Sequence, residues 1–359
     1  MILPRSFRRS RRRLAGAHRL RLKFLLNETE FREQANRERA RADRNGLPLA
    51  ILIVALPRDH ATERDIANLA TRLQKRLRVF DTAGQLKGGL IAVLLPDTPK
   101  SGAWKVASDI CEYYPLGPAR PDCEVFVYPD DSKTNSEQLQ SEEEPAAPQG
   151  VATFESFFAY PVPMLKRSVD VIGASVGLVF ASPLFAVLAM IVKITSPGPV
   201  LFAQLREGHG GREFRMYKLR SMHMNAHLDQ SRLRAQSVQD GPAFKMPNDP
   251  RTTWIGRFLR RTSLDELPQL WNVLMGDMSL VGPRPLPLDE SRKCAPWQRN
   301  RLAVRPGLTC VWQVRGRSTV SFESWMRMDL KYLRRRSFIY DLQLLLSTIP
   351  SLVLSRGPR

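Results

Sequence analysis

Residues 171–192 read VIGASVGLVFASPLFAVLAMIV and contain no charged side chain. At about 1.5 Å per residue, a helix of this length would just cross a hydrocarbon core of about 30 Å. Ser182 and Pro183 lie near its middle. Two structures fit this pattern: a transmembrane helix that tolerates the proline, or a re-entrant helix that breaks there and returns to its side of entry. Composition alone does not choose between them, but both associate this segment with a membrane.

The chain has 359 residues, which gives room for two or three domains, and a formal net charge of +20. Such an excess of positive charge requires an anionic partner: nucleic acid, anionic lipid head groups or phosphorylated substrates. No acid occurs in residues 1–23, a run typical of a solvated arm that beside a membrane would act as a tether. Residues 1–45 as a whole are predicted to be a basic arm. No apolar h-region follows the charges of residues 1–23, so we do not expect a secretory signal peptide.

The four cysteines are scattered, and none of them has CxxC spacing: Cys111, Cys123, Cys294 and Cys310. This pattern predicts neither a disulfide framework nor a zinc site. It is consistent with a reducing, cytoplasmic environment.

Residues 46–128 are predicted to form a small α/β domain. The expected order is strand 47–56, helix 62–77, a segment 79–89 leading into strand 90–95, helix 102–114 and strand 124–128. This β-α-β-β-α-β order is typical of a ferredoxin-like sandwich. Residues 129–150 are polar, acidic and proline-containing, with almost nothing to bury, and are predicted to be a disordered linker. A second domain is then expected over 151–359.

The first domain also resembles a diguanylate-cyclase (GGDEF) domain, through RVFD at 78–81, the pair Gly88-Gly89 and AVLLP at 92–96. That family places acidic residues after the two glycines, where this chain has Leu90 and Ile91. The resemblance therefore implies a degenerate domain that is inactive as a cyclase. An ordinary α/β module is the alternative.

The sequence SLDELPQL at 263–270 contains two adjacent carboxylates, Asp265 and Glu266, just downstream of several arginines. One carboxylate can attack phosphorus or hold a metal while guanidinium groups neutralise the phosphate oxygens. Ser263 and Glu266 also have the spacing of a capping box, which is common where helices start. Pro268 complicates that alternative, because it would fall inside the hydrogen-bonded part of a helix capped at Ser263.

Residues 163–356 closely resemble the bacterial sugar transferases, the monotopic polyprenyl-phosphate sugar-1-phosphate transferases. The resemblance is carried by the order and spacing of several motifs rather than by one of them. These are Ser182-Pro183, TSPGPVLF (195–202), FRMYKLRSM (214–222), DPRT (249–252), SLDELPQL (263–270), MSLVGPRP (278–285) and RPGLTCVWQVRGR (305–317).

The resemblance implies an α-rich α+β membrane domain that enters one leaflet through a re-entrant helix over 166–194, broken at Ser182-Pro183. Such enzymes transfer a sugar-1-phosphate from a nucleotide diphosphate sugar, expected here to be a UDP-sugar, to undecaprenyl phosphate and so begin glycan assembly. The expected location is the cytoplasmic face of the bacterial inner membrane, in contact with its lipids, as a monomer or homodimer. No nucleic-acid partner is expected.

The resemblance also assigns residues to the site. Asp265 is the expected nucleophile, which forms a phospho-aspartyl intermediate, and Glu266 assists it. Mg²⁺ is the implied cofactor, with Asp265 as its ligand, because a hard cation suits carboxylate and phosphate oxygens. The remaining predicted site residues are Arg260, Arg284, Arg317, Lys218 and Asp341. Cys310 departs from the family pattern, which has glycine there, and would be strained if the position required a positive φ.

Two other functions remain open. The first alternative is a catalytically idle, membrane-attached regulatory or nucleic-acid-binding scaffold. The second is a single-span protein with its catalytic part outside the cell. The intact Asp265-Glu266 pair with its arginines favours an enzyme over a scaffold, since a scaffold need not retain them. The scattered cysteines disfavour an exported catalytic part.

Overall fold

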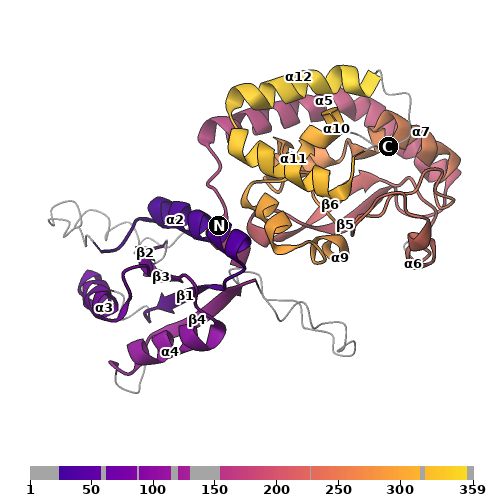
Figure 1. Ribbon diagram of the computed structural model, residues 1–359. Helices are drawn as coiled ribbons and strands as arrows, with labels where there is room; N and C mark the ends of the chain where they lie inside the picture. Colours follow the sequence, from indigo (N-terminus) through magenta and orange to yellow (C-terminus); the bar gives the residue numbers. More distant parts are fainter. Residues whose placement is uncertain are drawn as a thin grey trace. The chain divides into compact units, whose positions relative to one another are not determined.

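The computed structural model describes residues 24–57, 62–86, 89–114, 120–129, 154–226, 228–315 and 320–353, and has mixed helix and sheet (Figure 1). The chain divides into two compact units. The first comprises Met1–Gln34 with Leu47–Val127, and the second comprises Ala35–Gly46 with Tyr128–Arg359. Except for Pro129, the predicted acidic linker lies outside the described residues, as do residues 1–23 of the predicted arm.

The first unit is a four-stranded sheet with two helices. Its elements are β1 (Leu49–Ala55), α3 (Glu63–Arg76), β2 (Thr82–Gln85), β3 (Ile91–Leu95), α4 (Lys100–Cys111) and β4 (Asp122–Tyr128). The strand order is β2-β3-β1-β4, with β1 and β3 antiparallel. Alternate residues of a strand share one face, so Leu52 and Val93, which are register partners, both enter the core beneath α3 and α4. The β-α-β-β-α-β order predicted from the sequence is present.

Helix α2 (Glu28–Asn45) occupies the second half of the segment that was predicted to be a basic arm. Within the second unit, its Ala35, Arg39 and Ala42 are buried, at spacings that fall on one helical face. The Arg39 guanidinium lies over the ring of Phe158, 4.6 Å from its centroid, and over that of Tyr128 at 4.8 Å. Aromatic partners of this kind stabilise a buried cation, which explains an ordered helix in so charged a sequence.

The second unit is mostly helical, with two small sheets. Strands β5 (Leu201–Glu207) and β6 (Glu213–Leu219) form an antiparallel hairpin, and β7 (Ser279–Val281) pairs with β8 (Gly307–Thr309) in parallel. The helices are η4 (Phe154–Phe158), α5 (Met164–Thr195), η5 (His209–Gly211), α6 (Gln230–Leu233), η6 (Arg234–Gln236), α7 (Trp254–Thr262), η7 (Leu264–Glu266), α8 (Gln269–Met275), α9 (Leu288–Ser291), η8 (Pro296–Ala303), α10 (Val311–Arg315), α11 (Phe322–Arg335) and α12 (Phe338–Val353).

Helix α5 contains the apolar segment and, among the described residues, is the one helix long and apolar enough to cross a membrane. It runs as a single helix through Pro183, where the family resemblance implied a break into two halves. Proline cannot donate to the carbonyl four residues before it, here that of Val179. The Ser182 hydroxyl donates to this carbonyl instead, at 2.8 Å. The Ser-Pro pair therefore satisfies its own freed acceptor, and the helix continues.

The first turns of α5 are fixed to the second unit by polar contacts. Arg167 donates to the carbonyl oxygens of Val273 (2.7 Å) and Leu274 (2.6 Å), at the end of α8. The buried Asp170 accepts hydrogen bonds from the Ser279 hydroxyl and the Leu280 N–H, both at 2.9 Å. These contacts hold the start of α5 against α8 and β7.

The last turns of α5 pack on the same unit. Leu188 and Val192 are buried in one cluster with Leu219, Ile255 and Leu259, which belong to β6 and α7. Both ends of the helix therefore lie against one folded body.

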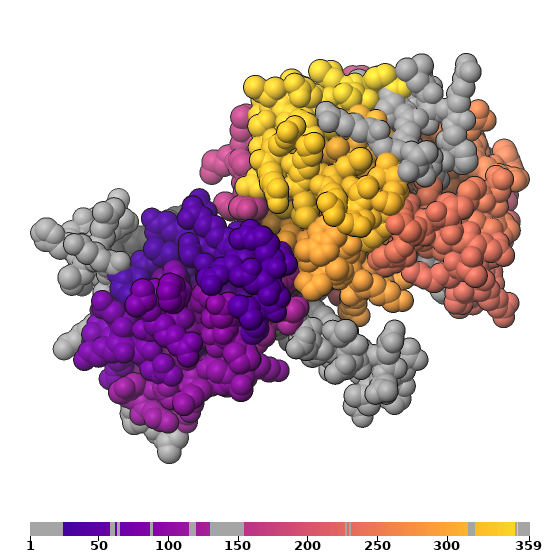
Figure 2. All heavy atoms as spheres, in the orientation of Figure 1, coloured from indigo at the N-terminus to yellow at the C-terminus, as the bar shows by residue number. Residues whose placement is uncertain are grey.

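Between these contacts α5 exposes an apolar face, with Phe180 81% exposed. Helices α7 and α12 also expose large apolar side chains, among them Trp254 and Ile339. The C-terminal residues, yellow in Figure 2, form a continuous surface of the second unit. Large apolar side chains exposed on three helices mark an interaction surface rather than an ordinary solvated one.

Candidate active site

The Asp265-Glu266 pair lies in a short, sharply turned segment. Helix α7 ends at Thr262, and Ser263 follows in the left-handed region with φ 60°. One 3₁₀ turn, η7, then carries both carboxylates, and α8 begins after Pro268. The Ser263 side chain does not cap η7, so the capping-box alternative is wrong. Pro268 instead stands at the N-cap of α8, where its missing N–H costs nothing.

Helix α7 approaches the end of β6 very closely. A Cβ atom on Gly256 would lie 1.9 Å from the carbonyl oxygen of Ser221, so only glycine fits there. The Thr253 N–H donates to the same carbonyl at 3.1 Å. This contact fixes the position of α7, and with it that of η7, relative to the β5–β6 hairpin.

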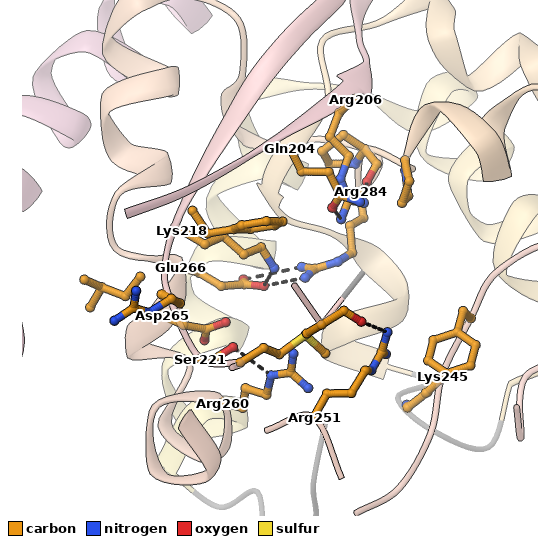
Figure 3. Close-up of a pocket in the computed structure, with 18 of the residues that line it drawn as sticks. Gln204, Arg206, Lys218, Ser221, Lys245, Arg251, Arg260, Asp265, Glu266 and Arg284 are labelled. Carbon is orange, nitrogen blue, oxygen red and sulfur yellow. Dashed lines mark hydrogen bonds and ion pairs between the residues drawn. The ribbon is translucent and has the colours of Figure 1, made fainter. Parts of the chain in front are cut away.

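A cavity of about 600 Å³ opens beside η7 (Figure 3). It is lined from the hairpin, from α7 and η7, and from the segment after β7. Five predicted site residues line it: Lys218, Arg260, Asp265, Glu266 and Arg284. The structure therefore brings together residues that are dispersed over more than sixty positions of the sequence.

Glu266 is held between two cations. Lys218 Nζ lies 3.1 Å from its Oε1, and the Arg284 guanidinium contacts both carboxylate oxygens, with Nη1 to Oε2 at 3.3 Å. Burial alone would raise the pKa of Glu266, but the charges of Arg284 and Lys218 outweigh burial and hold this pKa well below its usual range. Glu266 is therefore ionised and fixed in place.

Asp265 has the opposite environment. It is only 6% exposed, and no hydrogen bond from the described residues reaches its carboxylate. Burial raises the pKa of Asp265, and the charge of Lys218 offsets this only in part. A carboxylate with unoccupied lone pairs in a cation-rich cavity is suited to bind a metal or to attack an electrophilic centre.

Arg260 faces the same cavity from α7. Its Nε donates to the Ser221 hydroxyl at 3.0 Å and its Nη1 to the Thr252 hydroxyl at 3.2 Å. Asp249 Oδ2 lies farther away, 4.0 Å from Nη1. Neutral hydroxyls orient the guanidinium without cancelling its charge, so Arg260 remains available to an anion.

Several cavity residues were not predicted as site residues. Arg251 forms a buried ion pair with Asp249 at 2.7 Å, and Arg206 donates to the Pro285 carbonyl at 2.7 Å. Lys245 and Glu290 also line the cavity, and burial raises the pKa of Glu290 to about 7. The Asp-Pro-Arg motif was a signal for Arg251. No local pattern indicates the other three, because tertiary packing brings them here.

Asp341 does not join this group. It pairs with Lys166 of α5 and accepts a hydrogen bond from the Tyr332 hydroxyl at 2.8 Å. These residues line a second cavity, of about 220 Å³, which contains neither Asp265 nor Glu266. Asp341 thus helps to fasten α5 to α12. Arg317 lies outside the described residues.

Mg²⁺ fits this site only in part. The described residues contain no group of three His, Cys, Asp or Glu side chains that could cage a metal ion. Mg²⁺ in phosphate-handling sites is usually held by one or two carboxylates together with substrate phosphates. Asp265 is free for this role, whereas Glu266 is occupied by two cations.

Cys310 is not strained. It is absent from the residues with positive φ and is buried. Its thiol donates to Gln313 Oε1 at 2.9 Å, and burial raises the pKa of the thiol. Cysteine therefore replaces the expected glycine without a backbone penalty.

Comparison with known proteins gives three informative relatives. The galactosyl transferase CpsE of Streptococcus agalactiae serotype III is 39% identical over 56% of this chain and 45% of its own length. The exopolysaccharide production protein ExoY of Rhizobium meliloti is 41% identical over 54% of this chain and 88% of its own length. A UDP-glucose:undecaprenyl-phosphate glucose-1-phosphate transferase of Caulobacter vibrioides is 41% identical over 54% of this chain and 71% of its own length. The chain thus spans less than half of CpsE but most of ExoY.

Among solved structures, the GGDEF domain of a Pseudomonas aeruginosa protein matches 31% of this chain with 25% identity and a TM-score of 0.26. A score this low does not assign the first unit, and the degenerate GGDEF-like domain stays a prediction. For the second unit the result is clear, because the family model "Bacterial sugar transferase" matches residues 162–355. The chain belongs to the bacterial sugar transferase family.

Proposed function

We propose that this chain transfers a sugar-1-phosphate from a UDP-sugar to undecaprenyl phosphate through a phospho-aspartyl intermediate on Asp265. One observation carries the proposal: Asp265 is buried and accepts no hydrogen bond from the described residues, beside a Glu266 that is fixed by Lys218 and Arg284. The names of relatives support the substrates, since the Caulobacter protein and one from Escherichia coli are named as UDP-glucose:undecaprenyl-phosphate glucose-1-phosphate transferases.

In the first step, a carboxylate oxygen of Asp265 attacks the phosphorus that bears the sugar. The bond from this phosphorus to the bridging oxygen breaks, and UMP leaves with the electron pair. In the second step, a phosphate oxygen of undecaprenyl phosphate attacks the same phosphorus, and the bond to Asp265 breaks. Asp265 is restored as a carboxylate, and the product is an undecaprenyl diphosphate sugar. Two displacements allow two anionic substrates to use one cavity in turn.

The surrounding cations fit the charge that develops in both steps. Arg260, whose hydrogen bonds go to hydroxyl groups, points its guanidinium into the cavity. Arg284 and Lys218 hold Glu266 so that it cannot move onto the nucleophile. Preorganised charges of this kind are the main source of stabilisation in phosphoryl transfer. When bound with the substrate phosphates at Asp265, Mg²⁺ would supply further neutralisation of phosphate charge.

The packing of α5 supports a one-sided membrane anchor. Its first turns bind β7 and its last turns pack on α7, which belong to the same folded unit. A helix that crossed the bilayer would place these ends on opposite faces. We therefore infer a monotopic domain on the cytoplasmic face of the inner membrane, with both ends of α5 on that face. The strand order β2-β3-β1-β4 likewise supports a ferredoxin-like first unit.

The direct test incubates the full chain, in membranes, with undecaprenyl phosphate and a panel of nucleotide sugars. Release of a nucleoside monophosphate with one of the UDP-sugars, dependent on Asp265, is expected. Absence of release with every donor would favour the idle scaffold. Release that persists unchanged in Asp265→Asn would exclude the phospho-aspartyl route.

A further inference from the structure

The backbone on either side of Arg284 is fixed at three consecutive carbonyl groups. The Pro283 oxygen accepts from the Gly307 N–H at 2.8 Å, and the Pro285 oxygen accepts from Arg206 Nη1 at 2.7 Å. Between them, the Arg284 oxygen accepts from the guanidinium of Arg301. Prolines restrict φ, which limits the conformations of this Pro-Arg-Pro segment. The three outside donors then fix the orientation of its carbonyl groups.

Arg301 is itself anchored. It lies on η8, is 4% exposed, and its Nη2 lies 2.8 Å from Oδ2 of Asp329, which is 1% exposed on α11. One guanidinium nitrogen thus serves both a buried carboxylate and the backbone of a cavity residue. A pair buried this deeply is weak evidence for a gain in stability, because desolvation costs about as much as the attraction returns.

We propose that Arg301, anchored by Asp329, is a positioning residue for Arg284. By fixing the Arg284 carbonyl it aims the Arg284 guanidinium at Glu266, and so keeps Glu266 off Asp265. Neither Arg301 nor Asp329 lines the cavity, so they act through Arg284 and not on the substrate. This inference rests on the proposed transferase function.

The chain provides a matched control on the same 3₁₀ helix. Arg299 is also largely buried, and it bridges Glu155 and Glu207, each at 2.6 Å. None of its hydrogen bonds reaches Arg284. A substitution at Arg299 therefore disturbs a comparable buried ion pair without touching the Pro-Arg-Pro segment.

The test compares Arg301→Lys with Arg299→Lys in the full chain, by steady-state UMP release and by thermal unfolding. Lysine keeps the charge beside Asp329, but its shorter side chain with a single ammonium does not reproduce the guanidinium geometry. We expect kcat of Arg301→Lys to fall about tenfold to a hundredfold with the donor KM nearly unchanged, as for a misplaced catalytic group. Arg299→Lys should retain kcat. Equal losses of kcat in both variants, or none in Arg301→Lys, would overturn the proposal.

A double-mutant cycle tests whether the effect passes through Arg284. In a chain that already carries Arg284→Lys, adding Arg301→Lys should change kcat less than twofold. Losses that multiply in the double variant would show that Arg301 acts independently, and would overturn the proposal.

If Arg301→Lys does not fold, Asp329→Asn replaces it in the same cycle, since it removes the anchor and keeps the guanidinium. Failure of the proposed transferase function is distinguishable from failure of this inference, because in the first case the unsubstituted chain would release no UMP.

Discussion

Arg284 contacts both carboxylate oxygens of Glu266, Nη1 to Oε2 at 3.3 Å, and makes no hydrogen bond to the adjacent Asp265. Two neighbouring carboxylates are thereby given different properties. Glu266 is ionised and immobile, whereas Asp265 keeps its lone pairs and has a raised pKa. Environments that separate two carboxyl groups in this way are how one site assigns different chemical roles to the same functional group.

Replacement of Asp265 by asparagine should abolish transfer. The amide is close in size but is a poor nucleophile and cannot form the phospho-enzyme. Membrane association should persist, because Asp265 lines the cavity and is not one of the exposed apolar side chains of α5. The checks are UMP release and recovery of the variant in the membrane fraction. Turnover like that of the unsubstituted chain would remove Asp265 from the nucleophile role.

The acidic limb of the pH–rate profile should lie above the ordinary value for aspartate, 3.8. Attack requires the ionised form, and a raised pKa means that Asp265 takes up its proton at a higher pH, so activity is lost as the pH falls through that value. Glu266, with its lowered pKa, stays charged throughout this range. The measurement is kcat/KM against pH. An acidic limb at or below 3.8 would contradict this assignment.

Arg284→Ala should cost about 2–4 kcal/mol of transition-state stabilisation, the scale for loss of one preorganised charge-stabilising donor. The variant removes a cation from the cavity and leaves Glu266 held by Lys218 alone. Arg292→Ala is the control, because Arg292 pairs with Glu213 on the exposed surface away from the cavity. The measurement is kcat/KM of each variant relative to that of the unsubstituted chain. A loss at Arg284 no larger than at Arg292 would exclude Arg284 from transition-state stabilisation.

Single cysteines at the two ends of α5 should label from the cytoplasmic side only. Ser168 and Pro197 are exposed positions just inside and just beyond the helix ends, and Arg292→Cys provides a cytoplasmic reference. An impermeant maleimide should modify all three in inside-out vesicles and none in intact spheroplasts. Modification of one end from outside would establish a transmembrane helix instead.

The sequence was most informative where the chemistry is local. The adjacent pair Asp265-Glu266 and the Pro-Arg-Pro context of Arg284 are continuous motifs, and the structure places them on one cavity. Lys218 was assigned only by family resemblance, and its contact with Glu266 joins residues 48 positions apart. Asp341 was likewise assigned by resemblance, and the structure places it on the second cavity. Its partner Lys166 lies 175 positions away, and only tertiary packing reveals that pair.

Elements of low apparent hydrophobicity were harder to predict. Helix α2 reads as a charged arm, because its burial depends on Arg39 meeting aromatic rings from Tyr128 and Phe158. A cation–π cage of this kind leaves no hydrophobic period in the helix itself.

The course of α5 through Pro183 was also not predictable. It depends on a single hydrogen bond from Ser182 to the carbonyl that the proline leaves free.

The most direct test of the account is intact-protein mass spectrometry after incubation with UDP-sugar in the absence of undecaprenyl phosphate. Covalent catalysis predicts that the chain gains the mass of one sugar-1-phosphate, that this group maps to Asp265, and that an equivalent amount of UMP appears as a burst. Adding undecaprenyl phosphate should then remove the adduct. If UMP appears only when both substrates are present and no adduct forms at Asp265, transfer is direct and the central claim is wrong.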